Sequence, residues 1–325
     1  MLATAIPSPS VSAIWIGPVR ITVYGVLIVT AIALAAWITW DRYKKRGGAG
    51  DVALDVYLWA IPFGLIGARF YHVITHPSDY FGPGMDPLAV FKTWEGGMAI
   101  FGAIGFGALG ALIGLRRAGQ RIGPFADSIA PALLIAQALG RIGNYFNQEL
   151  FGGPTDLPWG LEIKDSILES FGLPAGTLVQ PIFLYEIIWN LCMAGLLLLI
   201  DKKVQVKSGQ LMALYLVAYG TGRVIMETMR LDTPDRILGL RVNMFTAICV
   251  VLLGLIVFYI CGRVGASTRV TPEEIARYKA IVARREGKTI EDSGSESISS
   301  DISDESVGDA DSSAEPQLDS AESES

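Results

Sequence analysis

The sequence predicts an all-α integral membrane protein with seven transmembrane helices. Three observations predict this class. Of the 325 residues 51% are hydrophobic, only 18% are charged, and the apolar residues gather in stretches long enough to cross a bilayer. A soluble globular protein averages about a quarter charged residues. The composition therefore excludes a soluble single-domain enzyme, a disulfide scaffold and a basic nucleic-acid-binding protein, and no nucleic acid partner is expected.

Each expected span is a stretch of about 20 mostly apolar residues. In chain order the spans are 14–40, 53–74, 97–115, 124–146, 181–200, 210–229 and 243–261. The first span is not a cleavable signal peptide, because no basic segment precedes it and no small-residue cleavage site follows it.

Basic residues indicate how the spans are oriented. They follow the first, third, fifth and seventh spans, in the segments 41–46, 116–121, 201–207 and 263–285. All four segments lie on the same side of a seven-helix topology, and that side is the cytoplasm by the positive-inside rule. The N-terminus is therefore expected outside and the C-terminus in the cytoplasm. The protein is expected to be a multi-pass protein of the cytoplasmic membrane.

The chain is expected to contain three parts. Residues 1–262 form the membrane domain, in which 147–180 is too long for a simple connection and forms a small extracytoplasmic head between the fourth and fifth spans. Residues 263–286 form a basic cytoplasmic segment. Residues 287–325 form an acidic tail, expected to be disordered; its last 35 residues hold 12 Asp and Glu and no Lys or Arg, so the rest of the chain has a net charge of +6.

Polar residues inside the spans are the candidate site, because ionisable groups in membrane helices are costly and are usually functional. Tyr219, Arg223 and Glu227 follow at intervals of four residues and share one helix face, which Arg230 continues. A second stripe holds Gln137, Arg141 and Asn144 on the fourth span.

The two stripes are expected at the same depth in the membrane. At about 1.5 Å per residue, Arg141 lies about 26 Å and Arg223 about 20 Å from the cytoplasmic ends of their helices, and Tyr24 lies about 15 Å below the outer face. Arginine suits bidentate phosphate binding. Two buried arginines in the outer half of the bilayer therefore suggest an anionic lipid headgroup as the ligand.

The sequence predicts no metal or other cofactor. Cys192, Cys249 and Cys261 lie in apolar runs, and the chain has no CxxC motif and no Cys/His cluster. Buried cysteines of this kind usually behave as small hydrophobic residues.

The polar segments resemble the motifs of prolipoprotein diacylglyceryl transferases. The longest and most specific is 140–152, GRIGNYFNQELFG; the others are 24–25 (YG), 94–98 (WEGGM), 179–186 (VQPIFLYE) and 219–227 (YGTGRVIME) with Arg230. The motifs occur in the family's order and cover about residues 14–262.

The resemblance implies transfer of the diacylglyceryl group from phosphatidylglycerol to the lipobox cysteine thiol in the signal peptide of a prolipoprotein. The product is a thioether, glycerol-1-phosphate leaves, and the active site faces the outer leaflet of a bacterial cytoplasmic membrane. The expected partners are phosphatidylglycerol, lipobox signal peptides and membrane lipids. By the resemblance Arg141 and Arg223 are essential, and the supporting residues are Tyr24, Asn144, Glu149, Gly152, Tyr219, Glu227 and Arg230.

One position departs from the family pattern. Phe101 stands where many members carry a histidine that has been proposed as the base, and Gln180 stands where a histidine is common. Another group must then accept the thiol proton. The candidates are Glu149, Tyr24 and Tyr219, or an arginine-stabilised thiolate forms and water takes the proton.

Two rival functions follow from the same residues. An anionic-lipid flippase would need a polar path through both leaflets, but the inner halves of the fourth and sixth spans are apolar. A catalytically inactive lipid-binding homologue would explain Phe101, but the retained arginines and the 140–152 motif argue against it.

Overall fold

The computed structural model describes residues 5–17, 19–82, 84–93, 96–231, 236–237 and 239–286. The long helices are α1 (Val23–Lys45), α2 (Gly50–Thr75), α4 (Ile100–Arg117), α5 (Ile122–Asn147), α7 (Ile182–Lys203), α8 (Gln210–Glu227), α9 (Val242–Val264) and α10 (Pro272–Glu286). The short elements are β1 (Ala13–Ile16), β2 (Val19–Thr22), α3 (Ser78–Phe81), η1 (Pro87–Phe91), α6 (Asp165–Ser170), β3 (Arg236–Ile237) and β4 (Leu240–Arg241). The chain divides into two compact units, Met1–Ile275 and Ala276–Ser325. Trp94, Glu95 and the expected acidic tail lie outside the described residues.

The prediction of an α-helical integral membrane protein is confirmed. Among the described residues, six helices are long and apolar enough to cross a membrane, namely α1, α2, α4, α5, α7 and α9. The expected sixth span coincides with α8, which has 18 residues and carries Arg223 and Glu227. It is not among the six, so the count of seven and the orientation stay predictions.

The prediction that the first span begins at residue 14 is wrong. Residues 13–22 form an antiparallel hairpin in which Ala13 pairs with Thr22 and the chain turns at Gly17 with φ 59°. Thr22 then caps α1, because its Oγ1 accepts from Gly25 N at 3.0 Å. Apolar β-branched and aromatic residues suit a strand as well as a membrane helix, so composition alone misassigned this segment. α1 remains long enough to span, at about 34 Å.

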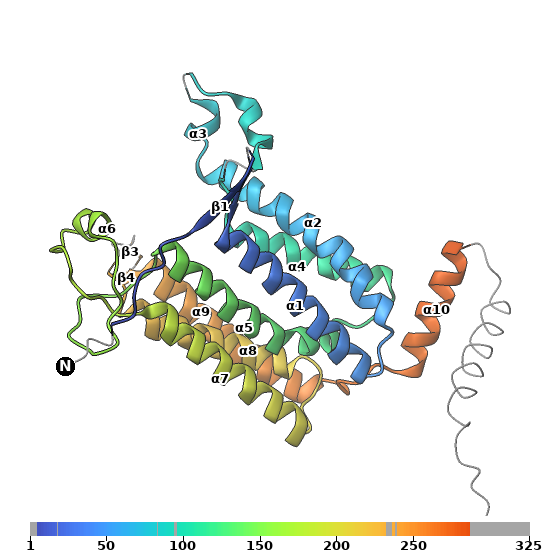
Figure 1. Cartoon of the computed structure of the whole chain (residues 1–325). Coiled ribbons are helices and arrows are strands. Elements are labelled where there is room, and N and C mark those ends of the chain that lie inside the picture. The colour runs from blue at the N-terminus through green and yellow to red at the C-terminus, as the bar shows by residue number, and fades with distance from the viewer. Residues whose placement is uncertain are drawn as a thin grey trace, which may run out of the picture. The chain divides into compact units, whose positions relative to one another are not determined.

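Small residues set the contact between α2 and α4, which run side by side (Figure 1). A Cβ atom at Gly67 would lie 2.6 Å from Gly102 O, and one at Gly110 would lie 2.5 Å from Trp59 O. Each distance is shorter than any real contact, so only glycine permits this approach, as in other membrane helix pairs. α4 therefore packs chiefly on α2, whereas α5 packs on α1, α7 and α8.

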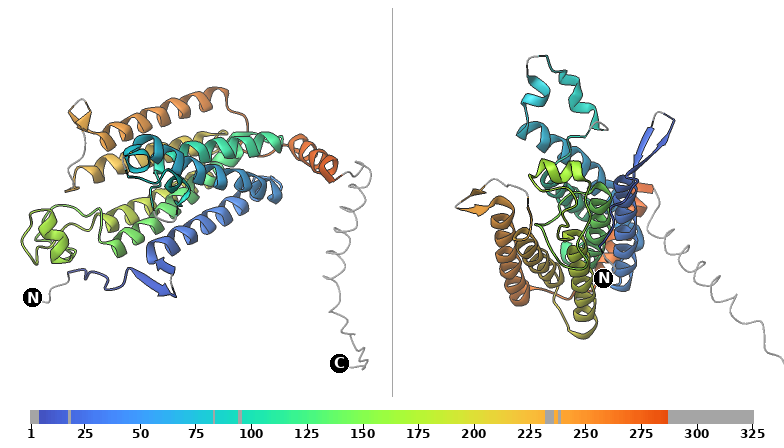
Figure 2. Two further views of the ribbon diagram at one scale, coloured as in Figure 1. Left: turned by 90° about the horizontal axis from the view of Figure 1, so that it is seen from above. Right: turned by 60° about the vertical axis from the view of Figure 1, so that its left-hand side comes forward.

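A buried apolar layer fixes α5, α7 and α8 against each other. Its buried members are Ala130, Leu134, Ala194, Leu197, Leu211 and Tyr215. Residues 147–180 then form a region at the end of α5 and α7 with an apolar cluster of its own (Figures 1 and 2). That cluster consists of Phe151, Leu161, Ile163, Leu168 and Val179. The layer and the cluster together position the polar residues at the ends of α5 and α8.

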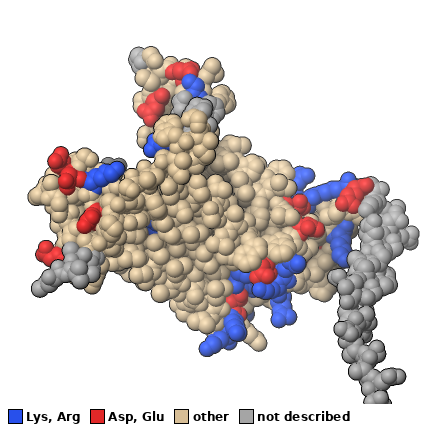
Figure 3. Space-filling model, in the orientation of Figure 1, with Lys and Arg blue, Asp and Glu red and all other residues tan. Residues whose placement is uncertain are grey.

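Basic side chains gather at the opposite end of these helices, which we call the basic end (Figure 3). It comprises the C-terminal turns of α1, α4, α7 and α9 and the segments that directly follow these helices. Asp201 pairs there with Arg42 at 2.8 Å and with Arg46 at 2.7 Å. The fully buried Asp127 caps α8, because it accepts from Gly209 N and Leu211 N at 2.8 and 3.0 Å. These bonds connect α1, α5, α7 and α8.

Glu274 and Arg121 form a second connection at the basic end, and its strength can be tested by pH. Arg121 Nε and Nη2 reach the Glu274 carboxylate at 2.8 and 2.9 Å. Burial alone would raise the pKa of Glu274, but hydrogen bonds from Arg121 and Thr271 outweigh it and lower that pKa from 4.5 to about 2. A lowered folded-state pKa stabilises the fold above the unfolded pKa, and this contribution is lost as the pH falls from about 4.5 to about 2.

We therefore expect Glu274→Gln to lower the melting temperature at pH 7 by a few degrees. This shift corresponds to about 1 kcal/mol of unfolding free energy, the size expected for a partly exposed ion pair. The difference from the wild type should shrink between pH 5 and pH 3. Thermal unfolding in detergent measures both values, with the exposed neighbour Glu273→Gln as the control. A difference that is the same at pH 5 and pH 3 would show that ionised Glu274 does not stabilise the fold.

Candidate functional site

One carboxylate joins the two arginines that the sequence singled out. Glu186 on α7 lies 2.5 Å from Arg141 Nε on α5 and 3.8 Å from Arg223 Nη1 on α8. Only 7% of Glu186 is exposed. Three helices therefore meet at one ion-pair network, and the prediction that Arg141 and Arg223 lie at one level of the bundle agrees with this geometry. We call these three residues the arginine cluster.

A second carboxylate lies one helical turn further along α8. Glu227 is fully buried, and Arg223 Nη2 lies 3.0 Å from its Oε2. Arg230 Nη1 lies 3.8 Å from the same oxygen, Arg241 Nε lies 3.5 Å from Oε1, and Asn243 donates to Oε1 at 3.2 Å. Removing one partner of such a buried network is costly. Arg223 is therefore held by two carboxylates, Glu227 at its Nη2 and Glu186 at its Nη1.

Arg141 keeps donors for a ligand. Its Nε pairs with Glu186 and its Nη1 donates to Asn144 Oδ1 at 3.1 Å. Its Nη2 has no partner among the residues that the structure describes. Because guanidinium carries five N–H donors in a planar fork, the free edge is suited to a phosphate or carboxylate.

Glu149 is held at the edge of the cluster by two amides. Asn144 Nδ2 donates to Glu149 Oε1 at 2.7 Å, and Asn147 Nδ2 donates to the same oxygen at 3.2 Å. The residues on either side, Gln148 and Leu150, have φ 53° and 61°. L-residues rarely adopt this left-handed conformation, which costs of order 1–3 kcal/mol and concentrates at functional sites. The turn after α5 therefore directs Glu149 back to Asn144, and through it to Arg141.

Tyr24 lies against α5 beside Asn144. A Cβ atom at Gly143 would lie 2.5 Å from the Tyr24 ring, so only glycine lets the ring come this close. Because α1 begins at Val23, Tyr24 lies in its first turn. The expected depth of about 15 Å assumed a helix that begins near residue 14, and the structure corrects that assumption.

Gln137 and two tyrosines form a polar group one turn from the arginine cluster, toward the basic end. Gln137 Nε2 donates to Tyr215 Oη at 2.9 Å, and the rings of Tyr215 and Tyr219 stack at 6.1 Å. Gln137 Oε1 is buried and has no hydrogen-bond partner among the described residues. A buried acceptor without a partner costs about 1–3 kcal/mol, so this oxygen is suited to a ligand donor or an ordered water.

Gly152 contributes through its backbone. It forms a bridge with Arg230, and Gly153 N donates to Met229 O at 3.2 Å. A Cβ atom at Gly152 would lie 2.9 Å from Met229 O. Gly152 therefore lets the chain after α5 pack against the residues that follow α8, which include Arg230.

Sequence reasoning missed Glu186, Arg241 and Asn243 as site residues. Glu186 ends the 179–186 motif and is a carboxylate within an apolar span, a signal that deserved the same weight as Glu227. Arg241 and Asn243 stand at the start of the last span, where an interfacial anchor is the ordinary interpretation. Their contacts with Glu227 depend on how α9 packs against α8.

Phe101 lies elsewhere. It is 53% exposed in the first turn of α4, and its ring lies 6.3 Å from that of Tyr71 on α2. None of the described contacts of the arginine cluster involves Phe101. Among the described residues there is also no group of three or more His, Cys, Asp or Glu residues that could hold a metal ion.

Comparison with known proteins gives a consistent result. A family model described as prolipoprotein diacylglyceryl transferase matches residues 11–260. Three curated relatives carry the name phosphatidylglycerol–prolipoprotein diacylglyceryl transferase. The relative from Paenarthrobacter aurescens strain TC1 is 48% identical over 78% of this chain and 83% of its own length. The one from Leifsonia xyli subsp. xyli is 49% identical over 74% of each chain, and the one from Bifidobacterium adolescentis is 41% identical over 85% of each.

Proposed function

The chain belongs to the prolipoprotein diacylglyceryl transferase family, and we propose that it transfers the diacylglyceryl group of phosphatidylglycerol to the lipobox cysteine thiol of a prolipoprotein signal peptide. The observation that carries this proposal is the arginine cluster, in which two arginines from different helices converge on Glu186. The reaction is the first step of bacterial lipoprotein maturation, and its products are a thioether and glycerol-1-phosphate.

Arg141 and Arg223 bind the phosphate of the lipid. The cysteine sulfur attacks the glycerol carbon, a C–S bond forms, and the C–O bond to the phosphate breaks with its electron pair remaining on the phosphate oxygen. The guanidinium groups stabilise the charge that builds there. The substrate supplies the nucleophile, so the enzyme's own cysteines, which lie on α7 and α9, are not needed.

Glu149 accepts the thiol proton and passes it to water. Unlike Glu186 and Glu227, it pairs with no arginine or lysine among the described residues, and it is exposed. Its amide partners Asn144 and Asn147 hold it beside Arg141, within the region where the phosphate binds. Tyr24 and Gln137 line the substrate site, and Tyr219 packs on the side of the site that is nearer the basic end.

The membrane placement follows from the charges. The basic end faces the cytoplasm by the positive-inside rule, α8 is the sixth of seven spans, the N-terminus is outside, and the arginine cluster opens to the outer leaflet. Buried partners offset the cost of its charges there, because Glu186 and Glu227 pair with Arg223 and both carboxylates are buried within the bundle.

The direct test uses purified protein in detergent with phosphatidylglycerol and a lipobox peptide. Mass spectrometry should find a diacylglyceryl adduct on the peptide cysteine and none on a peptide in which serine replaces that cysteine. Folded protein that forms no adduct would overturn the proposal and favour an inactive lipid-binding homologue. After reconstitution into liposomes, movement of phosphatidylglycerol between leaflets without adduct would favour a flippase.

Phe101→Ala is expected to leave transfer within a few-fold of the wild type. The side chain is half exposed and contacts Tyr71 rather than the arginine cluster, and its removal costs little buried surface. Initial rates of peptide lipidation measure the effect, with Phe101→His as the matched variant. A well-folded Phe101→Ala protein without activity, or a large gain in Phe101→His, would show that this position takes part in the reaction.

A further inference from the structure

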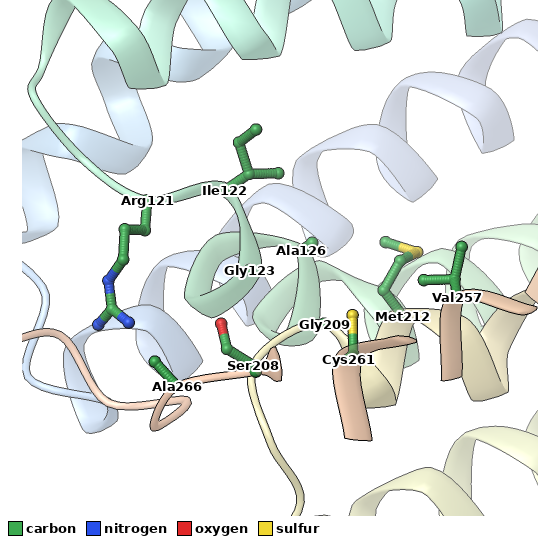
Figure 4. Close-up of a pocket in the computed structure, with 11 residues that line it drawn as sticks. Arg121, Ile122, Gly123, Ala126, Ser208, Gly209, Met212, Val257, Cys261 and Ala266 are labelled. Carbon is green, nitrogen blue, oxygen red and sulfur yellow. The ribbon is translucent and has the colours of Figure 1, made fainter. Parts of the chain in front are cut away.

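A cavity of about 420 Å³ lies at the basic end, far from the arginine cluster (Figure 4). It lies between the first turn of α5, the first turn of α8 and the last turns of α9. Most of its wall is apolar, with Ala126, Met212, Val257 and Cys261 among the lining residues, and Ser208 adds one hydroxyl. Ala126 precedes Arg141 by 15 residues on α5, which places the cavity about 22 Å from the arginine level. The cavity is therefore not part of the transferase site.

A positive charge lies at the rim of the cavity. Lys207 packs at the rim, where a Cβ atom on the lining residue Gly265 would lie 3.1 Å from Lys207 Cβ. Its ammonium donates to Gly262 O at 2.8 Å, and its side chain is exposed. Arg263 lies over the Tyr259 ring at 5.2 Å and lines a separate hollow. Arg121 also lines the cavity, but Glu274 pairs with it.

We propose that this cavity binds one acyl chain of an anionic phospholipid from the leaflet at the basic end, with the lipid phosphate on Lys207 at the rim. The volume lies in the range of ligand pockets. Because most of the lining side chains are apolar, a polar ligand would find few hydrogen-bond partners there, whereas the wall suits a hydrocarbon chain. Basic pockets between membrane helices on the cytoplasmic side bind anionic headgroups. The proposal needs only the membrane location and does not depend on the transferase activity.

Cys261 makes the proposal testable, because its thiol lines the cavity. The variant Cys192→Ser/Cys249→Ser leaves Cys261 as the only thiol in the chain. Its rate of alkylation by N-ethylmaleimide can be followed by intact mass in nanodiscs of phosphatidylcholine alone or with phosphatidylglycerol, without any peptide. We expect phosphatidylglycerol to slow alkylation about tenfold, the factor for a site occupied nine-tenths of the time.

Charge variants separate a specific site from general attraction. In the same cysteine background, Lys207→Gln should abolish the protection by phosphatidylglycerol. The matched control Lys203→Gln removes the same charge from an exposed residue of the basic end and should keep it. Equal rates in the two lipids, or equal loss of protection in both charge variants, would overturn the proposal. Protection by inorganic phosphate in phosphatidylcholine nanodiscs would also overturn it, because the ligand would then not be a lipid.

Discussion

Replacement of Arg141 or Arg223 with alanine is expected to lower kcat for diacylglyceryl transfer by at least about 10²–10³-fold, the usual effect of removing one donor to a developing anion. The two guanidinium groups bind the phosphate that leaves, and no other described residue of the arginine cluster is a cation. Arg141→Lys should recover only part of the loss, because an ammonium cannot form the bidentate contact. Rates of peptide lipidation by mass spectrometry measure all three variants.

The fold should survive these substitutions, which makes the activity loss interpretable. Glu186 keeps Arg223 as a partner in Arg141→Ala, and Glu227 keeps Arg230 and Arg241 in Arg223→Ala. Melting temperatures in detergent check this expectation. Transfer at the wild-type rate in either folded variant would contradict the proposed site.

The sequence was sufficient for most of the membrane fold. Only a helix satisfies its own backbone in lipid, so an apolar stretch of about 20 residues implies a helix without further information. The prediction failed at residues 13–22, because the hairpin has the same apolar composition as the helix that follows it. The sequence contains a break there, Gly17 followed by Pro18, but hydropathy averaged over a window does not register it.

The sequence likewise predicted only part of the candidate site. Residues on one helix were found together, because the interval of four residues places Arg223 and Glu227 on one face whatever the rest of the fold does. Contacts between helices were not found, since they depend on how far each helix is rotated and where it crosses its neighbour. Glu186 is the clearest case, because its place between Arg141 and Arg223 follows from the packing of α7 on α5 and α8.

That position makes Glu186 the second residue with a large expected effect. Glu186→Gln keeps the shape of the side chain and removes its charge, so the two guanidinium groups lose the anion that holds them together. We expect kcat to fall about 10–100-fold, because misplaced groups no longer meet the leaving phosphate. KM for phosphatidylglycerol should fall, because the lost negative charge no longer opposes the lipid anion.

The changes in kcat and KM together distinguish a role of Glu186 in positioning the arginines from a simple loss of stability. A loss of stability would lower the amount of active enzyme, leave KM unchanged and add independently to the effect of a substitution at Arg141. A double-mutant cycle with Arg141→Lys should therefore be non-additive, since the two side chains lie 2.5 Å apart. Glu169→Gln, an exposed carboxylate in α6, is the matched control and should match the wild type. A wild-type kcat in folded Glu186→Gln, or strict additivity with Arg141→Lys, would mean that the carboxylate does not set the geometry of the arginines during the reaction.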